Sequence, residues 1–409
     1  MIMQDRLSGV TMKKRLMILG ASYTQNPLYM TARSLGITTI AASIPGDYPG
    51  FDLADEKAYA DISDPEQVLA AAGKLQIDGI ATCGLDLGMR SIGHVCEALG
   101  LPGPSRSAAL KASDKWEMKK ALTAAGVQTA RFFCIHNTEE LEAAMEQLPW
   151  PVILKATDQM GGRGIIRCDT REEVLRAYPR VMEGTKRDYC LLEEFIAGEL
   201  FGVEAMIRNG RMVFILPNNT EAFTGDTPTP IGHSVPLRES AVLGGQILEQ
   251  TQKAVRALGL DNCPVNCDFI KKDGKVYVIE LTGRSGATGL SEMTGLYYGI
   301  NYYEAIVKTA LGLPVEDMFT APGTQPSVLT HTLISSVSGR VGQIRVDESL
   351  QRDPHIKDLS FNIREGDEIR KYTNGRDRIG QVILTGTDLA DCEKRLAGVL
   401  AGIDIRLAE

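Results

Sequence analysis

Two carboxylates, Asp268 and Glu280, stand on two short β-type runs joined by an Asp-Gly turn. Both runs are rich in β-branched and aromatic residues, which is typical of a β-hairpin. In such a hairpin the two acids can face the same side and share a hard cation such as Mg²⁺. Thr282 and Arg284 follow directly, and an extra oxygen and a guanidinium at this strand end suit phosphate oxygens. A surface hairpin whose acids are merely solvated is the alternative.

A lysine and a glycine-rich turn lie upstream at positions that favour anion binding. Lys155 ends an apolar strand predicted over 151–155, where an unpaired ammonium is costly unless it meets an anion. A phosphate would satisfy this lysine, and Glu193, at the end of another buried strand, could do so structurally. Residues 158–166 continue as a hairpin-like flap. Its glycine-rich tip can expose backbone N–H groups, because glycine permits the necessary dihedral angles.

The first hundred residues alternate strand and helix. Strands are predicted over 15–20, 38–43 and 78–82, and helices over 66–75 and 89–99. This alternation implies βαβ units and a parallel sheet. The turn after the first strand lacks the GxGxxG pattern, so a Rossmann dinucleotide site is disfavoured. The turn is still a natural ligand position at the carboxyl end of a sheet.

The rest of the chain mixes strands and helices. A helix is predicted from Lys115 and another over 297–312, and an amphipathic helix over 388–402 closes the chain. The segment Asn218 to Pro236 is rich in proline and threonine, so we predict a long loop over a site. We predict His233, within that loop, to be a surface histidine rather than a substrate contact.

Size and composition limit the class of protein. At 409 residues the chain exceeds one ordinary core and should divide into two to four domains. A net charge of −8 argues against a general nucleic-acid binder. No apolar run approaches the roughly 20 residues that span a bilayer, and residues 1–13 are predicted to be a flexible leader without the pattern of a secretory signal. Most of the eight cysteines lie in apolar contexts, so we expect free thiols in a reduced, cytoplasmic protein.

Taken in order, these motifs resemble the ATP-grasp superfamily, and within it the carboxylate–amine ligases. The match covers roughly residues 14–409, and its best-defined motifs lie between 113 and 288. The resemblance implies a protein of mixed α/β and α+β class with the ATP-grasp fold. The implied parts are an N-terminal α/β pre-ATP-grasp domain with a parallel sheet (14–104), an ATP-grasp core (105–315) with a small lobe (105–190) and a large lobe (191–315), and a C-terminal mainly β subdomain (316–409).

The same resemblance implies roles for individual residues. Arg284 and Lys155 would be catalytic. The family's ribose-binding glutamate falls at Leu200, with an acid one residue earlier, and many relatives carry Asn where this chain has Thr282. The residues implied to bind ATP are Lys115, Lys155, Gly161, Gly162, Arg163, Gly164, Glu193, Glu194, Phe195, Ile196 and Glu199. Those implied to bind one or two Mg²⁺ ions, with Mn²⁺ as an alternative, are Asp268, Glu280 and Thr282.

The resemblance also implies a reaction. A substrate carboxylate would attack the γ-phosphate of ATP to give an acyl-phosphate and ADP, and an amine would then displace phosphate. The segment around Arg376 and Arg378 resembles the closing domain of purine-biosynthesis members and of bacterial L-amino-acid ligases. We expect a small carboxylate, in the first place an amino acid, and an amine as substrates, in a protein that can form a homodimer and binds neither nucleic acid nor membrane. A phosphoribosyl-substrate ligase and a catalytically silent ATP-binding module are the alternatives.

Overall fold

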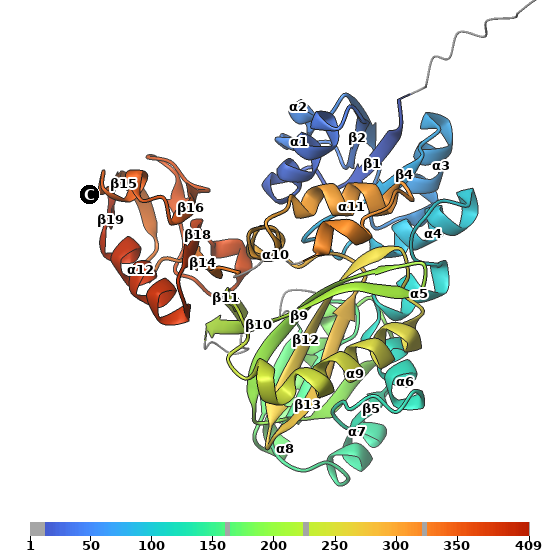
Figure 1. The fold of residues 1–409 in the computed structure, drawn as a ribbon. Helices are drawn as coiled ribbons and strands as arrows, with labels where there is room; N and C mark the ends of the chain where they lie inside the picture. The colour runs from blue at the N-terminus through green and yellow to red at the C-terminus, as the bar shows by residue number, and fades with distance from the viewer. Residues whose placement is uncertain (1–12, 160–163, 224–228, 321–324, 409) are drawn as a thin grey trace, which may run out of the picture.

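The computed structural model describes residues 13–159, 164–223, 229–320 and 325–408. An N-terminal region lies above a central region, and the C-terminal region lies to the side of both (Figure 1). The first region is built on a parallel sheet, and the sheets of the other two are antiparallel. The predicted mixture of α/β and α+β structure is therefore confirmed.

The N-terminal sheet has the strand order β3-β2-β1-β4 and is parallel throughout, as predicted. Side chains of β1 alternate between its two faces, as the period of a strand requires. Leu16 and Ile18 join the core cluster that contains Ile306, whereas Met17 and Leu19 join the cluster that contains Val68. The elements are β1 (Arg15–Leu19), α1 (Asn26–Ser34), β2 (Thr38–Ser43), α2 (Gly50–Leu53), β3 (Glu56–Tyr59), α3 (Pro65–Leu75), β4 (Gly79–Ala81) and α4 (Met89–Leu99).

The next region is a small lobe with its own antiparallel sheet of order β5-β8-β6-β7. Its helix α6 begins at Lys115, as predicted, because the Asp114 side chain accepts from the backbone N–H groups of residues 116 and 117. Strands β6 and β7 form the predicted hairpin, with Lys155 opposite Ile165. The elements are α5 (Arg106–Lys111), α6 (Lys115–Ala124), β5 (Phe132–Ile135), α7 (Thr138–Met145), β6 (Val152–Ala156), β7 (Ile165–Cys168), α8 (Arg171–Gly184) and β8 (Cys190–Glu194).

An eight-stranded sheet of order β13-β12-β9-β10-β11-β14-β18-β16 runs from the central region into the C-terminal region. Helix α9 packs against the strands at the β13 end of this sheet (Figure 1). The hairpin predicted around the Asp273-Gly274 turn is present, with Asp268 opposite Glu280. The elements are β9 (Glu199–Arg208), β10 (Arg211–Phe223), β11 (Thr229–Val235), α9 (Ser240–Leu258), β12 (Cys263–Lys272) and β13 (Lys275–Thr282).

The prediction of a long loop from Asn218 to Pro236 is wrong. Its described residues belong largely to β10 and β11, which pair with each other. Threonine favours strands, and Pro230 lies beside a register shift, where the sheet tolerates a residue without a backbone N–H. His233 is consequently only 7% exposed rather than a surface histidine. Burial lowers its pKa to about 4, which makes it a neutral part of the sheet at pH 7.

The helix predicted over 297–312 is present as α11, but it starts later than predicted, because an earlier helix, α10, ends at Tyr298. Gly299, with φ of 68°, ends α10, and the Asn301 side chain caps α11. The closing amphipathic helix is confirmed as α12, and a further strand follows it. The remaining elements are α10 (Leu290–Tyr298), α11 (Tyr302–Ala310), β14 (Ser327–Leu333), β15 (Gly339–Val346), β16 (Ile356–Phe361), β17 (Glu368–Ile369), β18 (Gly380–Gly386), α12 (Leu389–Ala401) and β19 (Ile403–Leu407), with 3₁₀ turns at Tyr23–Gln25, Glu316–Phe319, Leu350–Arg352 and Gly375–Asp377.

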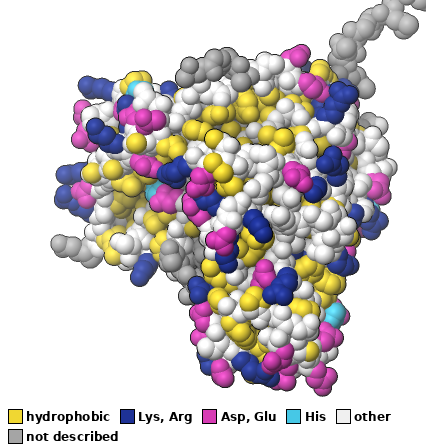
Figure 2. All heavy atoms as spheres, turned by 60° about the horizontal axis from the view of Figure 1, so that its bottom comes forward, with side chains coloured by type: hydrophobic (Ala, Val, Ile, Leu, Met, Phe, Trp, Pro, Cys, Tyr) yellow, Lys and Arg dark blue, Asp and Glu magenta, His cyan; other side chains and the backbone are white. Residues whose placement is uncertain are grey.

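The surface mixes both signs of charge. On the face in Figure 2, Lys and Arg side chains are interspersed with Asp and Glu among the described residues. This face therefore lacks the single-sign field that steers a polyanion. Among the helices of the described residues, none is both long enough and apolar enough to cross a membrane.

Candidate active site

The carboxylate pair lies on the hairpin of β12 and β13, with Asp268 directly opposite Glu280. Burial, together with the negative charge of Glu280, raises the pKa of Asp268 to about 7. The protein thus leaves much of this negative charge uncompensated. Two hard carboxylate ligands whose negative charge is not fully compensated by the protein fit a divalent cation such as Mg²⁺.

Lys115 joins the small lobe to this hairpin. Its Nζ lies 3.3 Å from Glu280 Oε2 and donates to the backbone oxygen of Gln159 at 2.9 Å. Burial lowers the pKa of Lys115, but the nearby carboxylates, Glu280 foremost, together outweigh burial and the net shift is upward. A permanent positive charge therefore lies beside the carboxylate pair, at the start of helix α6.

Glu193 binds two lysines in the small lobe. Its Oε2 accepts from Lys155 Nζ at 2.9 Å and lies 3.0 Å from Lys119 Nζ. Burial opposes ionisation of Glu193, yet the two ammonium groups hold its pKa below the usual range. Sequence reasoning considered the Lys155 pair and missed Lys119. The available signal was its spacing, since a lysine four residues after Lys115 occupies the same helix face.

Arg284 binds Asp86, a residue that sequence reasoning missed. Its Nε and Nη2 donate to the two oxygens of Asp86 at 2.7 and 2.6 Å. The Thr282 hydroxyl also donates to Asp86, at 3.0 Å. Burial would raise the pKa of Asp86, but Arg284 and Thr282 hold it below the usual range. The signal for Asp86 was an acid just after the last strand of the parallel sheet, where ligand sites gather.

Backbone contacts reinforce this junction between the N-terminal region and the strand end. Cys83 forms a β-bridge with Ser285, and the Gly84 N–H donates to the Ser285 oxygen at 3.1 Å. Gly84 has φ of 61°, a conformation that glycine adopts without strain. The loop after β4 is therefore fixed against the residues around Arg284.

Glu204 is fully buried next to Arg284. Its Oε1 accepts from Asn266 Nδ2 at 2.9 Å and from the Gly286 N–H at 3.0 Å. Its Oε2 has no hydrogen-bond partner among the described residues. Burial raises the pKa of Glu204 to about 8, although the charge of Arg284 opposes this shift. Glu204 is therefore largely a neutral acid at pH 7.

The Glu204→Gln variant should gain stability relative to the wild type as pH rises. The wild-type pKa is raised in the folded state, so the folded protein holds this proton more tightly than the unfolded chain. Because of this group, the free energy of unfolding of the wild type should fall as the pH rises from 4.5 to 8, by up to about 4 kcal/mol. Gln lacks this dependence and keeps an oxygen for both donors. Urea unfolding of both proteins at pH 5 and pH 8.5 measures this effect. If the difference in free energy of unfolding between variant and wild type is the same at both pH values, the prediction is contradicted.

The strand end at 193–196 has further contacts of its own. Arg131 Nε donates to Glu194 at 2.8 Å, and the Arg167 guanidinium lies 4.6 Å from the Phe195 ring centroid. Ile196 is buried. Residues 193–196, called the 193–196 edge below, thus cover the end of the inner strand β8 and the residues that follow it.

Some predicted positions are less enclosed or lie outside the described residues. Glu199 is exposed at the start of β9 and lies 3.1 Å from Lys271, while Leu200 faces Ile270. The Gly164 oxygen accepts from the Ala156 N–H at 2.7 Å. Gly161, Gly162 and Arg163 lie outside the described residues.

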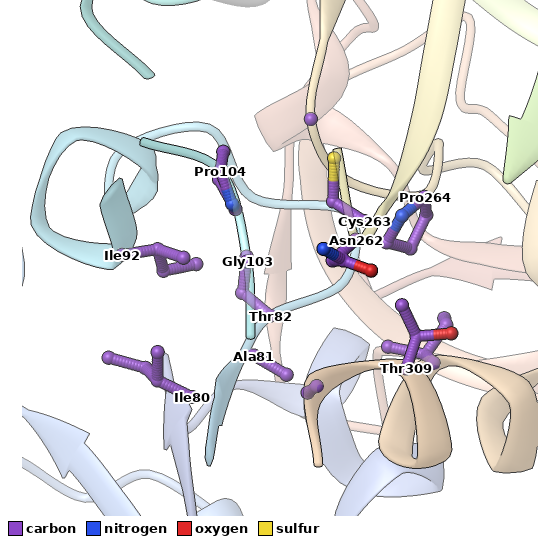
Figure 3. Close-up of a pocket in the computed structure, with 13 residues that line it drawn as sticks. Ile80, Ala81, Thr82, Ile92, Gly103, Pro104, Asn262, Cys263, Pro264 and Thr309 are labelled. Atoms are coloured by element: carbon purple, nitrogen blue, oxygen red, sulfur yellow. The ribbon is translucent and has the colours of Figure 1, made fainter. Parts of the chain in front are cut away.

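A small cavity lies between the N-terminal sheet and the central region (Figure 3). Its volume is about 20 Å³, which is room for roughly one water molecule. Ile80, Cys263 and Thr309 contribute to its lining. The cavity is a packing gap between domains and is too small for a substrate.

Comparison with known proteins identifies the family of this chain. Residues 112–288 match the family model for the ATP-grasp domain, and residues 331–408 match that for L-amino acid ligase C-terminal domain 2. The crystal structure of phosphoribosylglycinamide synthetase from Anaerococcus prevotii superposes with a TM-score of 0.83 at 38% identity, covering 97% of this chain and 100% of that chain.

Two further similarities extend over most of the chain. The L-amino acid ligase from Bacillus licheniformis superposes with a TM-score of 0.83 at 20% identity, over 97% of this chain and 99% of that chain. A formate-dependent phosphoribosylglycinamide formyltransferase from Methanocella arvoryzae is 21% identical over 93% of this chain and 90% of its own length. The chain therefore belongs to the ATP-grasp superfamily, among its ATP-dependent carboxylate–amine ligases, as the order of its motifs predicted.

Proposed function

We propose that this ligase activates a small carboxylate, in the first place an amino acid, and couples it to an amine. A carboxylate oxygen of the substrate attacks the γ-phosphorus of ATP, and ADP leaves. The amine nitrogen then attacks the acyl carbon, phosphate leaves, and an amide remains. The observation that carries the chemistry is the convergence of Lys115, the carboxylate pair and Arg284 at one strand end.

In this proposal each group of the site has a role. Asp268 and Glu280 would hold Mg²⁺, which when bound neutralises charge on the phosphoryl group. Lys115 and Lys155 would bind phosphate oxygens, and Arg284 would steady the acyl-phosphate. The glycine-rich tip, the 193–196 edge and Glu199 would hold the rest of ATP. Thr282 would act through Asp86, because its hydroxyl donates to that carboxylate.

The position of Arg378 supports an amino acid as the carboxylate substrate. Arg378 reaches back from the C-terminal region, and its Nη2 lies 3.4 Å from Thr24 Oγ1. The Cys83 thiol donates to the Thr24 backbone oxygen, and Cys83 bridges to the residue after Arg284. A carboxylate bound at Arg378 would therefore lie close to the reacting strand end.

The charges around Arg378 favour a zwitterion. Glu292 lies near enough for its charge to act on Arg378, and it accepts from the Tyr303 hydroxyl at 2.6 Å. Burial raises the pKa of Glu292, and the charge of Asp358 adds to that shift. A guanidinium with an acid near it suits a carboxylate together with an ammonium, and a phosphate dianion supplies no ammonium for that acid.

A phosphoribosyl-substrate ligase is the second candidate. The Anaerococcus prevotii protein, at 38% identity, is called a phosphoribosylglycinamide synthetase. Arg376 and Arg378 would then bind the substrate phosphate. Arg376 is exposed in the structure, which leaves Arg378 as the arginine of this pair that faces the site.

Phosphate release from ATP and Mg²⁺ tests the proposal across amino acids, alone and in pairs, with glycinamide ribonucleotide plus formate alongside. We expect release that requires a particular amino acid, and hydroxylamine should trap its acyl-phosphate. The Arg378→Gln variant should raise the KM for that amino acid, whereas the exposed Arg376→Gln control should not. Release only with the ribonucleotide would establish the second candidate. Bound ATP without any release would favour a silent nucleotide-binding module.

A further inference from the structure

Lys119 is a fully buried lysine that the catalytic proposal does not use. It is 2% exposed, and its ammonium donates to Thr129 Oγ1 at 2.8 Å and lies 3.0 Å from Glu193 Oε2. Thr129 in turn donates to the Val278 backbone oxygen at 2.7 Å. The Lys119 ammonium therefore links Glu193, through Thr129, to strand β13 of the eight-stranded sheet.

Glu193 uses only one of its two oxygens in these contacts. Lys119 and Lys155 both meet Oε2, whereas Oε1 is buried and has no hydrogen-bond partner among the described residues. A buried carboxylate oxygen without a donor is costly, so such atoms in native structures nearly always have a partner. The geometry points to a ligand donor for Oε1.

The charges indicate what kind of donor fits. Two ammonium groups already surround the one carboxylate, so a third cation would be repelled. A neutral N–H donor would not be repelled. Glu193 also begins the 193–196 edge where the base of ATP would lie under the proposed function, and the exocyclic amino group of adenine is such a donor.

We propose that Lys119 is a positioning residue for selection of the nucleobase. Together with Lys155 it holds Glu193 so that Oε1 points away from both lysines and accepts an N–H from the adenine amino group. Without Lys119, Glu193 would be free to turn both oxygens toward Lys155, and the acceptor would be lost. The inference rests on the proposed function in one respect, the binding of ATP at this edge.

Calorimetric titration with ADP and with purine riboside 5′-diphosphate, which lacks the amino group, tests the proposal. The wild type should prefer ADP by about 10- to 100-fold, as expected for a hydrogen bond to a charged acceptor. In Lys119→Met this preference should fall to about threefold or less. Lys120→Met is the matched control, since Lys120 is exposed on the same helix and pairs with Glu117. It should keep the wild-type preference.

A wild-type preference for ADP in folded Lys119→Met would overturn the proposal. If Lys119→Met does not fold, Thr129→Val removes the other anchor of the ammonium while keeping the lysine, and an unchanged preference in that variant overturns the proposal equally. Equal binding of the two nucleotides by the wild type would show that Oε1 does not contact the base. Failure of the wild type to bind either nucleotide would instead refute the proposed function, which this inference assumes.

Discussion

Glu280→Gln should lower ATP-dependent phosphate release by about 10³-fold while leaving the fold intact. Glu280 lies opposite Asp268 on the hairpin, and the two carboxylates are the hard ligands available to Mg²⁺. Gln keeps the shape of the side chain and removes its charge. The metal would then be held by Asp268 alone. Steady-state phosphate release at saturating Mg²⁺ is the measurement, with circular dichroism to confirm folding.

A matched control separates this effect from a general loss of charge. Glu249 is an exposed glutamate on α9 that pairs with Lys253, so Glu249→Gln should release phosphate at the wild-type rate. Raising Mg²⁺ should restore part of the activity of Glu280→Gln, because the variant binds metal more weakly. Wild-type turnover by Glu280→Gln would mean that the metal is held elsewhere.

Arg284→Gln should also lower phosphate release by about 10³-fold, the scale reported for arginines that stabilise a transferring phosphoryl group. In the structure this guanidinium is 11% exposed and binds Asp86 through two nitrogens, with Asn266 Oδ1 3.5 Å from its third. The same residue thus has a structural role in joining two regions and a proposed chemical role. A loss of activity in Arg284→Gln alone would not separate the two.

Asp86→Asn separates these roles. It weakens the attachment between the regions, but it leaves the guanidinium in place for the acyl-phosphate. We expect Asp86→Asn to lose about tenfold in rate, far less than Arg284→Gln. Equal losses in the two variants would show that Arg284 serves only to bind Asp86. Phosphate release of the two single variants and the double variant provides the comparison.

The parts of the site that could be predicted are those in which chemistry and local structure share a short segment. Asp268 and Glu280 flank one Asp-Gly turn, so the strand period and the turn alone place them together. Lys115 follows an Asp that caps a helix, and Lys155 ends an apolar strand. Each of these positions follows from hydrogen bonding within a few residues.

The parts that could not be predicted depend on contacts between residues far apart in the sequence. Asp86 lies 198 residues before Arg284, and Glu204 lies 82 residues before Gly286. The place of Asp86 after a strand of the parallel sheet is a signal for a ligand site, but no local pattern names Arg284 as its partner or pairs Glu204 with Gly286. The loop predicted over 218–236 failed for a related reason, because its pairing partner β14 lies far along the chain and overrides the local turn-like composition.

The bidentate contact between Asp86 and Arg284 also limits how the gene can be recombined. An N-terminal region exchanged between relatives must carry a carboxylate at position 86, or the recipient would retain an arginine with most of its surface covered and its main partner missing. An uncompensated buried charge costs roughly 3–5 kcal/mol, a large share of the stability of an ordinary domain. For chimaeras with crossover points between residues 86 and 284, we therefore expect stability to depend more on the identity of these two residues than on overall sequence similarity.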